Sequence, residues 1–409
     1  MKRSIAMLGL GLMAGLGWFA PPATAQETFK IAYIDPASGP FANVGDAGKH
    51  HFEYFAEQIN AKGGILGKPI QLLFYDSQVN SKVSVEKVKQ AIDEGAVIVA
   101  QGNSSGVANA ITDAVLRHNT RNPGKEILYF NYAAVDPALT NDKCNFWHFR
   151  FDAHADIKMK ALVKALVQTG RMHKVYVLGQ NYSFGQAVAA AAEREITAQA
   201  PGVEVVANEL HPLGKVKDFS PYINKIRASG ADTLITGNWG NDMSLLIKAA
   251  SDAGLKTLNA TYYADGLGVA TAMGATALGT LNISEGNLND APDTDKRMYR
   301  EFKQRYKIDY YYYRVQNMFD FLVAAANKAQ SLKPIPIARA LEGMEIKTAR
   351  GRAFMRADDH QVFMPMYVSE YAKDVEFDLE DTGYGWKTVR RIETEDTVTP
   401  TTCQMERPS

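Results

Sequence analysis

The stretch FKIAYIDPASGPFANVGDAGKHHFEYFAEQINAKGGILGKPIQLLFY, residues 29–75, alternates between two kinds of secondary structure. Residues 29–34 (FKIAYI) form a short apolar run that ends at an aspartate and a proline, which predicts a buried strand. Residues 45–60 have the apolar spacing of an amphipathic helix, and Gly63-Gly64 ends it. A second apolar run, residues 70–75 (IQLLFY), follows. This order indicates a parallel sheet covered by helices.

The same alternation continues on both sides of a boundary near residues 148–152. Further strands are predicted at 97–100, 127–131, 175–178, 203–206 and 233–236, and further helices at 81–94, 107–119, 154–168, 184–200, 219–228, 241–253, 294–306 and 314–330. Two sets of similar size predict an α/β fold of two doubly wound lobes. We expect the run of four tyrosines at 310–313 to be an exposed loop or helix start. We expect residues 374–409 to form a polar surface tail.

The first 25 residues have the layout of a secretory signal peptide. Lys2 and Arg3 precede an apolar run over residues 5–20, which is shorter than the roughly 20 residues of a membrane span. Small residues then lead to a predicted cleavage site after Ala25. We therefore predict an exported, periplasmic protein.

Composition excludes several classes of protein. The apolar fraction of 46% is that of a globular chain and excludes a disordered one. Without Lys2 and Arg3 the mature chain has 43 basic and 45 acidic residues. Because the basic residues are scattered, we expect no nucleic-acid partner.

The chain has two cysteines, Cys144 and Cys403, and their spacing fits no zinc site. In an oxidising compartment, a disulfide between them would tie the C-terminal tail to a distant part of the chain. Two unpaired thiols are the alternative.

Loops that follow parallel strands are the candidate binding sites, because ligands of open α/β sheets bind at the carboxyl ends of the strands. The loop at 101–106 (QGNSSG) opens a predicted helix, and its glycines allow a ligand to approach the backbone. Amides at a helix N-terminus favour an anion, and Ser104 and Ser105 add hydroxyl donors. The loop predicts a carboxylate site, although a capped helix start without a ligand explains the same residues equally well.

Two alternatives involve other chemistry. The same loop matches G-x-S-x-G, so Ser104 could be the nucleophile of an α/β-hydrolase, with His360 as the only late candidate for its base. His148, His154 and Asp156 could bind a metal, but a polar helix start explains them as well. We predict that the protein is not an enzyme and that it has neither a metal nor a cofactor.

Several motifs resemble those of the leucine/isoleucine/valine-binding proteins, which are periplasmic substrate-binding proteins of ABC importers. The most specific motif is INAKGGILG at residues 59–67. The others are SGP at 38–40, Gly45-Asp46, Tyr75-Asp76, Ser104-Ser105, DPALT at 136–140, Phe184-Gly185, Asp218-Phe219 and AGLK at 253–256. The resemblance extends to about residue 373.

This resemblance implies a type I periplasmic-binding fold, in which two α/β lobes joined by three crossovers close on a ligand. Residues 26–149 and 286–358 would form lobe 1, residues 150–285 and 359–373 would form lobe 2, and the crossovers would lie near residues 150, 285–287 and 355–363. The protein, which we expect to be monomeric, would then pass its ligand to a membrane permease.

The resemblance also assigns ligand contacts in lobe 1. In the family, a serine after the third strand holds the ligand carboxylate, and Ser105 matches that position. Ala133 matches a residue whose carbonyl contacts the ligand. Val135 replaces a threonine, which removes one hydroxyl contact and leaves the backbone N–H.

In lobe 2, Phe184 and Trp239 match aromatic residues of the family, and Tyr262 or Tyr263 could join them. Asp265 matches the acid that pairs with the ligand ammonium, one methylene shorter than the usual glutamate. An aromatic cleft with this acid predicts a branched-chain or other hydrophobic amino acid as ligand. An aromatic carboxylate is the alternative ligand, but it would leave the acid unpaired.

Overall fold

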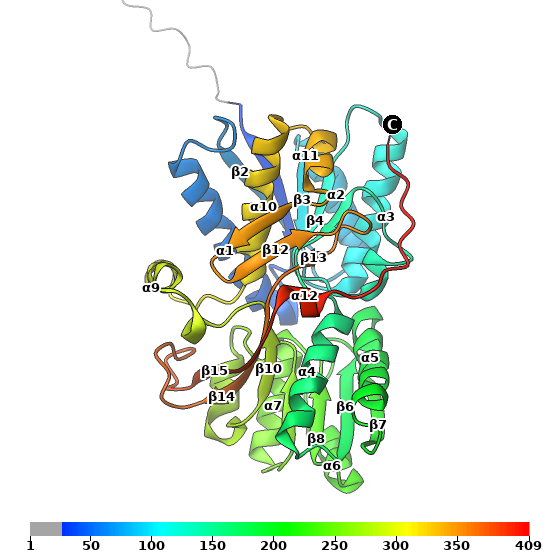
Figure 1. Cartoon of the computed structure of the whole chain (residues 1–409), viewed down its shortest axis with the longest axis vertical. Helices are drawn as coiled ribbons and strands as arrows, with labels where there is room; N and C mark the ends of the chain where they lie inside the picture. The colour runs from blue at the N-terminus through cyan, green and yellow to red at the C-terminus, as the bar shows by residue number, and fades with distance from the viewer. Residues whose placement is uncertain (1–26, 409) are drawn as a thin grey trace, which may run out of the picture.

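The computed structural model describes residues 27–408, so the predicted signal peptide lies outside the described residues. The chain forms two α/β lobes that lie one above the other (Figure 1). Each lobe has its own mostly parallel sheet with helices on both faces, which confirms the predicted fold class.

Lobe 1 is built on a parallel sheet of five strands in the order β2-β1-β3-β4-β5. These strands are β1 (Phe29–Asp35), β2 (Ile70–Asp76), β3 (Ile98–Gln101), β4 (Leu128–Asn131) and β5 (His148–Arg150). Its helices are α1 (Ala42–Ala61), α2 (Ser81–Asp93), α3 (Ser105–Arg121), α10 (Tyr313–Ala329) and α11 (Pro334–Leu341). A small sheet lies beside α10 and consists of β11 (Glu345–Thr348), β12 (Gly351–Met355) and β13 (Val362–Phe363).

Lobe 2 is built on seven strands in the order β15-β14-β10-β9-β8-β6-β7. They are β6 (Lys174–Gln180), β7 (Glu204–His211), β8 (Thr233–Thr236), β9 (Leu258–Thr261), β10 (Leu281–Ser284), β14 (Met366–Ala372) and β15 (Gly385–Ile392), of which β14 and β15 run antiparallel to their neighbours. Its helices are α4 (Ala155–Thr169), α5 (Ser183–Gln199), α6 (Ser220–Ser229), α7 (Gly240–Asp252) and α8 (Val269–Met273); α9 (Asp293–Tyr306) and α12 (Thr394–Thr397) lie at the junction of the lobes.

The central strands are apolar because helices cover both of their faces. All four residues of β3 are buried, as are all four of β4 and β8. Two helices of lobe 2 end at a glycine where the backbone turns left-handed: Gly170 ends α4 at φ 64° and Gly230 ends α6 at φ 67°. These short strands place their following loops at the edges where the lobes face each other.

Three segments cross between the lobes before the C-terminal region. The first joins β5 to α4 and the second joins β10 to α9. The third lies at Met364-Pro365, later than the boundary we expected between residues 358 and 359. The reason is that β13 pairs with β12 of lobe 1, so residues 359–363 stay with that lobe.

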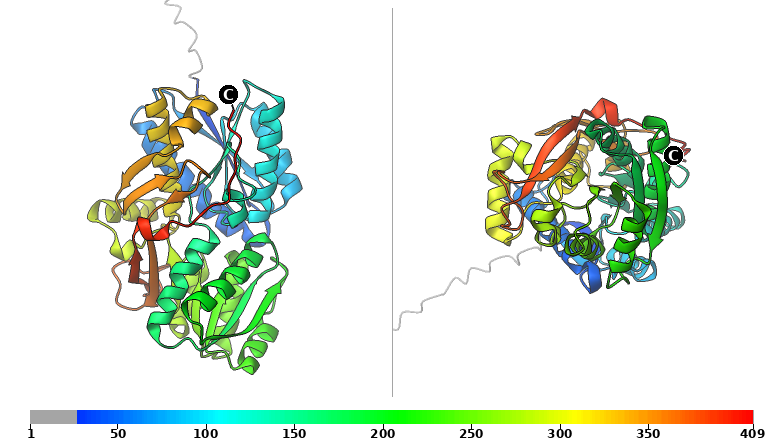
Figure 2. Two further views of the ribbon diagram at one scale, coloured as in Figure 1. Left: turned by 45° about the vertical axis from the view of Figure 1, so that its right-hand side comes forward. Right: turned by 90° about the horizontal axis from the view of Figure 1, so that it is seen from below.

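The C-terminal region is not an irregular tail throughout, contrary to expectation. Residues 385–392 form β15, which pairs with β14 at the edge of the lobe 2 sheet, with one shift of register at Val389. Its sequence, GWKTVRRI, looked polar because alternate residues of an edge strand face solvent. The chain then passes α12 and runs along lobe 1 (Figure 2). There Cys403 forms a disulfide with Cys144.

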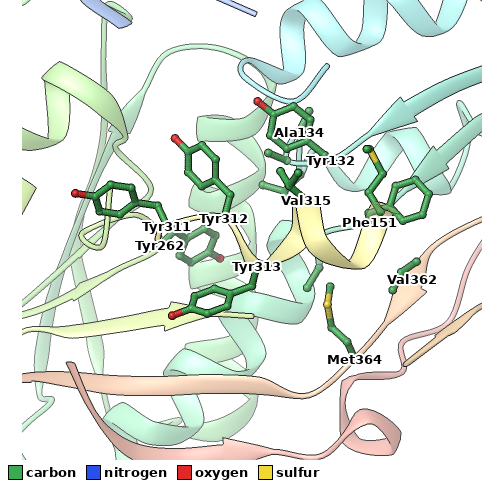
Figure 3. Close-up of a cluster of buried hydrophobic side chains, with 14 of the residues drawn as sticks. Tyr132, Ala134, Phe151, Tyr262, Tyr311, Tyr312, Tyr313, Val315, Val362 and Met364 are labelled. Atoms are coloured by element: carbon green, nitrogen blue, oxygen red, sulfur yellow. The ribbon is translucent and has the colours of Figure 1, made fainter. Parts of the chain in front are cut away.

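The four tyrosines at 310–313 are also placed differently from our expectation, because all of them are buried. Figure 3 shows Tyr311, Tyr312 and Tyr313 among side chains of both lobes, including Tyr132 and Tyr262. They fill the junction of the lobes at the start of α10, whose first residue is Tyr313. Among residues 27–408, no helix is long and apolar enough to span a bilayer.

Candidate functional site

The cavity between the two lobes is the candidate binding site. The space between its walls, part of it open to solvent, is about 550 Å³. Loops that follow β3 and β4 form its lobe 1 wall, and loops that follow β6, β8 and β9 form its lobe 2 wall. All seven predicted contact residues line this one cavity: Ser104, Ser105, Ala133, Val135, Phe184, Trp239 and Asp265.

The lobe 1 wall presents hydroxyl groups at the N-terminus of a helix. Ser104 precedes α3 with φ 85°, a left-handed conformation that costs a non-glycine residue free energy. Ser105 begins α3, and its Oγ accepts a hydrogen bond of 3.2 Å from the Asp136 amide. That bond leaves the hydroxyl hydrogen of Ser105 available to a ligand acceptor. The wall is therefore suited to an anion such as a carboxylate.

A buried carboxylate, that of Asp35 at the end of β1, holds this loop from behind. Its oxygens accept hydrogen bonds from the amides of Gly102 (3.2 Å) and Asn103 (2.8 Å) and from the Tyr132 hydroxyl (2.6 Å). Burial raises the pKa of Asp35 to about 7, although these three donors oppose the rise. Sequence reasoning missed Asp35, whose role depends on strand order rather than on any motif.

The loop after β4 adds an apolar edge to the cavity. Ala133 and Val135 both line it, and both side chains are buried. Asn131 fixes the loop through its Oδ1, which accepts from the Ala134 amide at 2.7 Å. Val135 gives this edge no side-chain hydroxyl.

The lobe 2 wall is aromatic. Phe184 lies in the first turn of α5, and Trp239 lies immediately before α7. The indole N–H of Trp239 donates to the Tyr182 hydroxyl at 2.7 Å, which orients both rings. Tyr263, rather than Tyr262, lines the cavity, and its ring centroid is 5.9 Å from that of Phe184. These rings suit an apolar ligand side chain.

Asp265, in the loop after β9, supplies the negative charge of the cavity. Among residues 27–408, no cationic side chain lies within ion-pair distance of its carboxylate. Burial raises the pKa of Asp265 to about 7, and repulsion from Glu285 adds to the rise. The site therefore holds an acid whose ionised form needs a cation from the ligand.

Arg314 also lines the cavity, and sequence reasoning missed it. Its Nη1 donates to both oxygens of Glu285 at 3.2 and 3.1 Å, and its guanidinium lies 4.5 Å from the centroid of the Tyr312 ring. Lys158 completes a buried cluster, 2.9 Å from Glu285 and 2.9 Å from Asp152. Burial alone would raise the pKa of Glu285, but Lys158 and Arg314 hold it well below its usual range. Arg314 thus shares the Glu285 carboxylate with Lys158.

The structure supports neither the serine hydrolase nor the metal site considered above. His360 stacks on Phe149 with ring centroids 4.0 Å apart, and its Nδ1 lies 3.1 Å from the His148 carbonyl. Among the described residues, no histidine lines the cavity that contains Ser104. Within residues 27–408, no three His, Cys, Asp or Glu side chains are grouped as metal ligands.

Comparison with known proteins identifies relatives of the whole chain. The family model described as periplasmic binding protein matches residues 28–376. The Leu/Ile/Val-binding protein homolog 4 of Brucella abortus (strain 2308) is 36% identical over 423 aligned positions, which cover all of this chain and 98% of the relative.

Solved structures agree with the sequence comparison. The leucine-, isoleucine-, valine-, threonine- and alanine-binding protein of Brucella ovis, in its closed conformation, superposes with a TM-score of 0.85 at 36% identity, covering 93% of this chain and 100% of that one. A solute-binding protein of an ABC transporter from Rhodopseudomonas palustris HaA2, in complex with p-hydroxybenzoic acid, has the same fold. It has a TM-score of 0.77 at 18% identity and covers 90% of this chain and 98% of that one.

Proposed function

This chain belongs to the periplasmic binding protein family, a family of binding proteins rather than enzymes, and on that premise we propose that it captures a hydrophobic amino acid for an ABC importer. The relative from Brucella named as a Leu/Ile/Val-binding protein homologue supports a branched-chain amino acid. The predicted signal peptide, residues 1–25, supports a periplasmic location.

One observation carries the choice of ligand. The cavity has an anion-binding helix N-terminus with Ser104 and Ser105 on one wall, and an acid without a cationic partner, Asp265, on the other. An α-amino acid carries both complementary charges. Its carboxylate would meet the serines and amides, and its ammonium would meet Asp265.

The remaining wall selects the side chain. Phe184, Trp239 and Tyr263 supply ring surface, and Val135 supplies a methyl surface. Burying an apolar side chain against such groups contributes roughly 25 cal/mol per Å² of apolar area removed from water. Leucine, isoleucine, valine and phenylalanine would gain most from this wall.

The proposed function depends on closure of the two lobes around the ligand and involves no reaction of the ligand. Each lobe supplies part of the binding set, so a ligand held by both favours the closed arrangement and is shielded from water. We propose that the closed, monomeric protein then docks on a membrane permease, which releases the ligand.

An aromatic carboxylate is the second candidate. The aromatic wall favours it, and a relative of the same fold binds p-hydroxybenzoic acid. Such a ligand has no ammonium, so it would require Asp265 to be protonated. Because a raised pKa makes the protonated form accessible, this candidate deserves a direct comparison.

Isothermal titration with leucine, phenylalanine and 4-hydroxybenzoate tests the proposal. We expect an amino acid to bind most tightly of the three ligands. Ser105→Ala and Asp265→Ala should each weaken the binding free energy of that amino acid by about 1–3 kcal/mol. Asp46→Ala, which changes an exposed carboxylate on α1, is the matched control and should bind normally. If only 4-hydroxybenzoate bound tightly, the ligand would be an aromatic carboxylate and not an amino acid. Unchanged affinity in both site variants would refute the site.

A further inference from the structure

A buried histidine on α1 holds the chain segment at the start of α10. His51 has no exposed surface, and its Nε2 accepts hydrogen bonds from the backbone amides of Tyr311 (3.0 Å) and Tyr312 (3.1 Å). Its Nδ1 lies 2.7 Å from the carbonyl oxygen of Ala47, one turn earlier on α1. The imidazole ring therefore joins α1 of lobe 1 to the tyrosine run at 310–313.

These contacts determine which nitrogen of the ring carries the hydrogen. A carbonyl oxygen can only accept, so Nδ1 must donate its hydrogen to Ala47. Two amides donate to Nε2, so that nitrogen must be unprotonated. Burial lowers the pKa of His51 to about 3, against the opposing effect of the Ala47 carbonyl, and nearby Arg314 and His50 disfavour a further positive charge. His51 is therefore a neutral Nδ1–H tautomer.

The two amides depend on this histidine. They precede Tyr313, the first residue of α10, and in the described part of the chain His51 is their only acceptor. A buried amide without an acceptor is costly, so the backbone should move if the histidine is removed. The rings of Phe302 and Tyr310, with centroids 4.4 and 4.7 Å from that of His51, fix the orientation of the imidazole.

The segment that His51 holds is part of the ligand cavity. Tyr312 and Arg314 both line the cavity, and the guanidinium lies 4.5 Å from the centroid of the Tyr312 ring. The Tyr312 hydroxyl also donates to the carbonyl of Val44, a cavity residue on α1, at 3.2 Å. Figure 3 shows Tyr312 beside Tyr311 at the start of α10. This side of the cavity is thus attached to α1 through its backbone and through one side chain.

We propose that His51, as its Nδ1–H tautomer, is a positioning residue that holds Tyr312 and Arg314 in the wall of the ligand cavity. His51 does not line the cavity itself. Because Arg314 donates to Glu285 in the second crossover, the same attachment connects α1 to the hinge between the lobes. The effect on amino-acid affinity rests on the proposed function, whereas the tautomer and the placement of the segment do not.

Titration calorimetry with leucine compares two variants of the full mature chain. Leucine at position 51 offers no acceptor, whereas glutamine can accept from both amides through its Oε1 and donate to Ala47 through its Nε2. We expect His51→Leu to lower the affinity for leucine about tenfold, and His51→Gln to recover most of that loss.

Two control variants separate positioning from general effects. His50→Gln changes the adjacent histidine, which stacks on Tyr306 outside the cavity, and should bind leucine normally. Val88→Ala removes part of a buried side chain on α2 and should lower the melting temperature without changing the affinity.

Two measurements need no ligand. Long-range ¹H–¹⁵N NMR spectra of the wild-type protein should place the hydrogen of His51 on Nδ1 at neutral pH, with its signals identified by their loss in His51→Gln. Hydrogen exchange of the Tyr311 and Tyr312 amides should become at least about tenfold faster in His51→Leu than in wild type.

Several results would overturn the proposal. Normal leucine affinity in a folded His51→Leu would do so, as would an equal loss in Val88→Ala, because the effect would then follow stability alone. Equal losses in His51→Leu and His51→Gln would show that hydrogen bonding is not the cause. A His51 ring protonated at Nε2 at neutral pH would also contradict it.

Failure of the proposed function would appear separately, as a wild-type protein that binds no leucine. Hydrogen exchange then decides the proposal: faster exchange of the Tyr311 and Tyr312 amides in His51→Leu supports it, and unchanged exchange overturns it.

Discussion

The Asp265 carboxylate should make ligand binding depend on pH. Burial raises its pKa to about 7, and it lacks a cationic partner among the described residues. An amino acid must bind the ionised form, so below pH 7 binding requires the release of a proton. We therefore expect affinity for an amino acid to fall by up to about tenfold for each pH unit below 7. An aromatic carboxylate without an ammonium would show the opposite sign, with affinity falling as the pH rises above 7.

Calorimetry in buffers of different ionisation enthalpy, from about pH 5.5 to about 8.5, counts the protons exchanged on binding. Asp265→Asn should bind weakly and lose most of this pH dependence. Retention of the full pH dependence in Asp265→Asn would assign the titration to another group, of which Asp35 is the first candidate because its pKa is also raised to about 7.

Asp35 should affect binding without touching the ligand, because it fixes the loop that carries Ser104. Asp35→Ala leaves the Gly102 and Asn103 amides without their acceptor, and we expect a loss of about 1–3 kcal/mol in unfolding free energy, with weaker ligand binding. Urea unfolding and titration calorimetry measure the two effects. The stabilising contribution of protonated Asp35 should diminish as the pH rises from about 4 to 7, since its native pKa lies above the unfolded value. Normal ligand affinity in Asp35→Ala would contradict the proposal that Asp35 fixes the loop that carries Ser104.

Residue by residue, the sequence revealed the groups that local pattern determines. The glycine and serine loop could be predicted because it joins an apolar run to a helix, and that order fixes its place at a sheet edge. Arg314 could not be predicted in this way. Its role depends on Glu285, which is 29 positions away in sequence and belongs to the other lobe's chain segment.

At the scale of elements, a direct contact between the lobes supplements the ligand contacts. The ring of Phe41, in the short 3-10 helix Gly39–Phe41 of lobe 1, lies 4.2 Å from the ring of Trp239 in lobe 2. The lobe 2 surface fits this ring because Gly214 and Gly240 leave room for it: a Cβ on either would lie within 2.8 Å of a Phe41 carbon. Phe41 does not line the cavity itself.

Removal of this ring should therefore lower the affinity for every ligand by the same factor. Phe41→Ala destabilises the closed arrangement alone, and we expect roughly tenfold or greater loss of affinity, mostly as faster dissociation. Stopped-flow release of leucine and of phenylalanine measures it. Phe74→Ala, which changes a ring that is 39% exposed on β2, is the control and should release ligand normally. A loss confined to one ligand would mean that Phe41 selects the ligand instead.

The predicted elements agree with the structure where burial is complete on both faces. Residues 233–236 were identifiable as a strand because TLIT lies between helices in the sequence, and β8 has those bounds. β15 escaped prediction because an edge strand mixes Trp386 and Ile392 with charged residues. The tyrosine run escaped for a different reason: its hydroxyl groups suggested exposure, whereas tertiary packing at the lobe junction buries them.

For the whole molecule, the C-terminal segment forms a fourth connection between the lobes. It leaves lobe 2 at the end of β15 and contacts lobe 1 through Thr394, whose hydroxyl donates to the Arg352 carbonyl at 2.6 Å. Thr401 then donates to the Thr140 carbonyl at 2.9 Å, and the Cys144–Cys403 disulfide lies two residues further along. The segment thus ties β15 to the surface of lobe 1.

Breaking the disulfide should release this connection and leave the other three crossovers intact. A bridge across 259 residues restricts the unfolded chain strongly, so we expect Cys144→Ser with Cys403→Ser to lower the unfolding free energy by about 2–5 kcal/mol. The ligand-free protein should also open more widely, because only non-covalent contacts, such as the hydrogen bond of Thr401 and the ion pair of Arg407 with Glu342, then hold the segment on lobe 1. Small-angle scattering should show a larger radius of gyration for the ligand-free double variant, and the same radius as wild type once ligand closes the lobes. Thr402→Ala, which keeps the disulfide and loses only a side-chain hydroxyl contact to Asn141, is the control. Equal radii for wild type and double variant without ligand would show that the three crossovers alone limit opening, and the segment would then stabilise the fold without controlling closure.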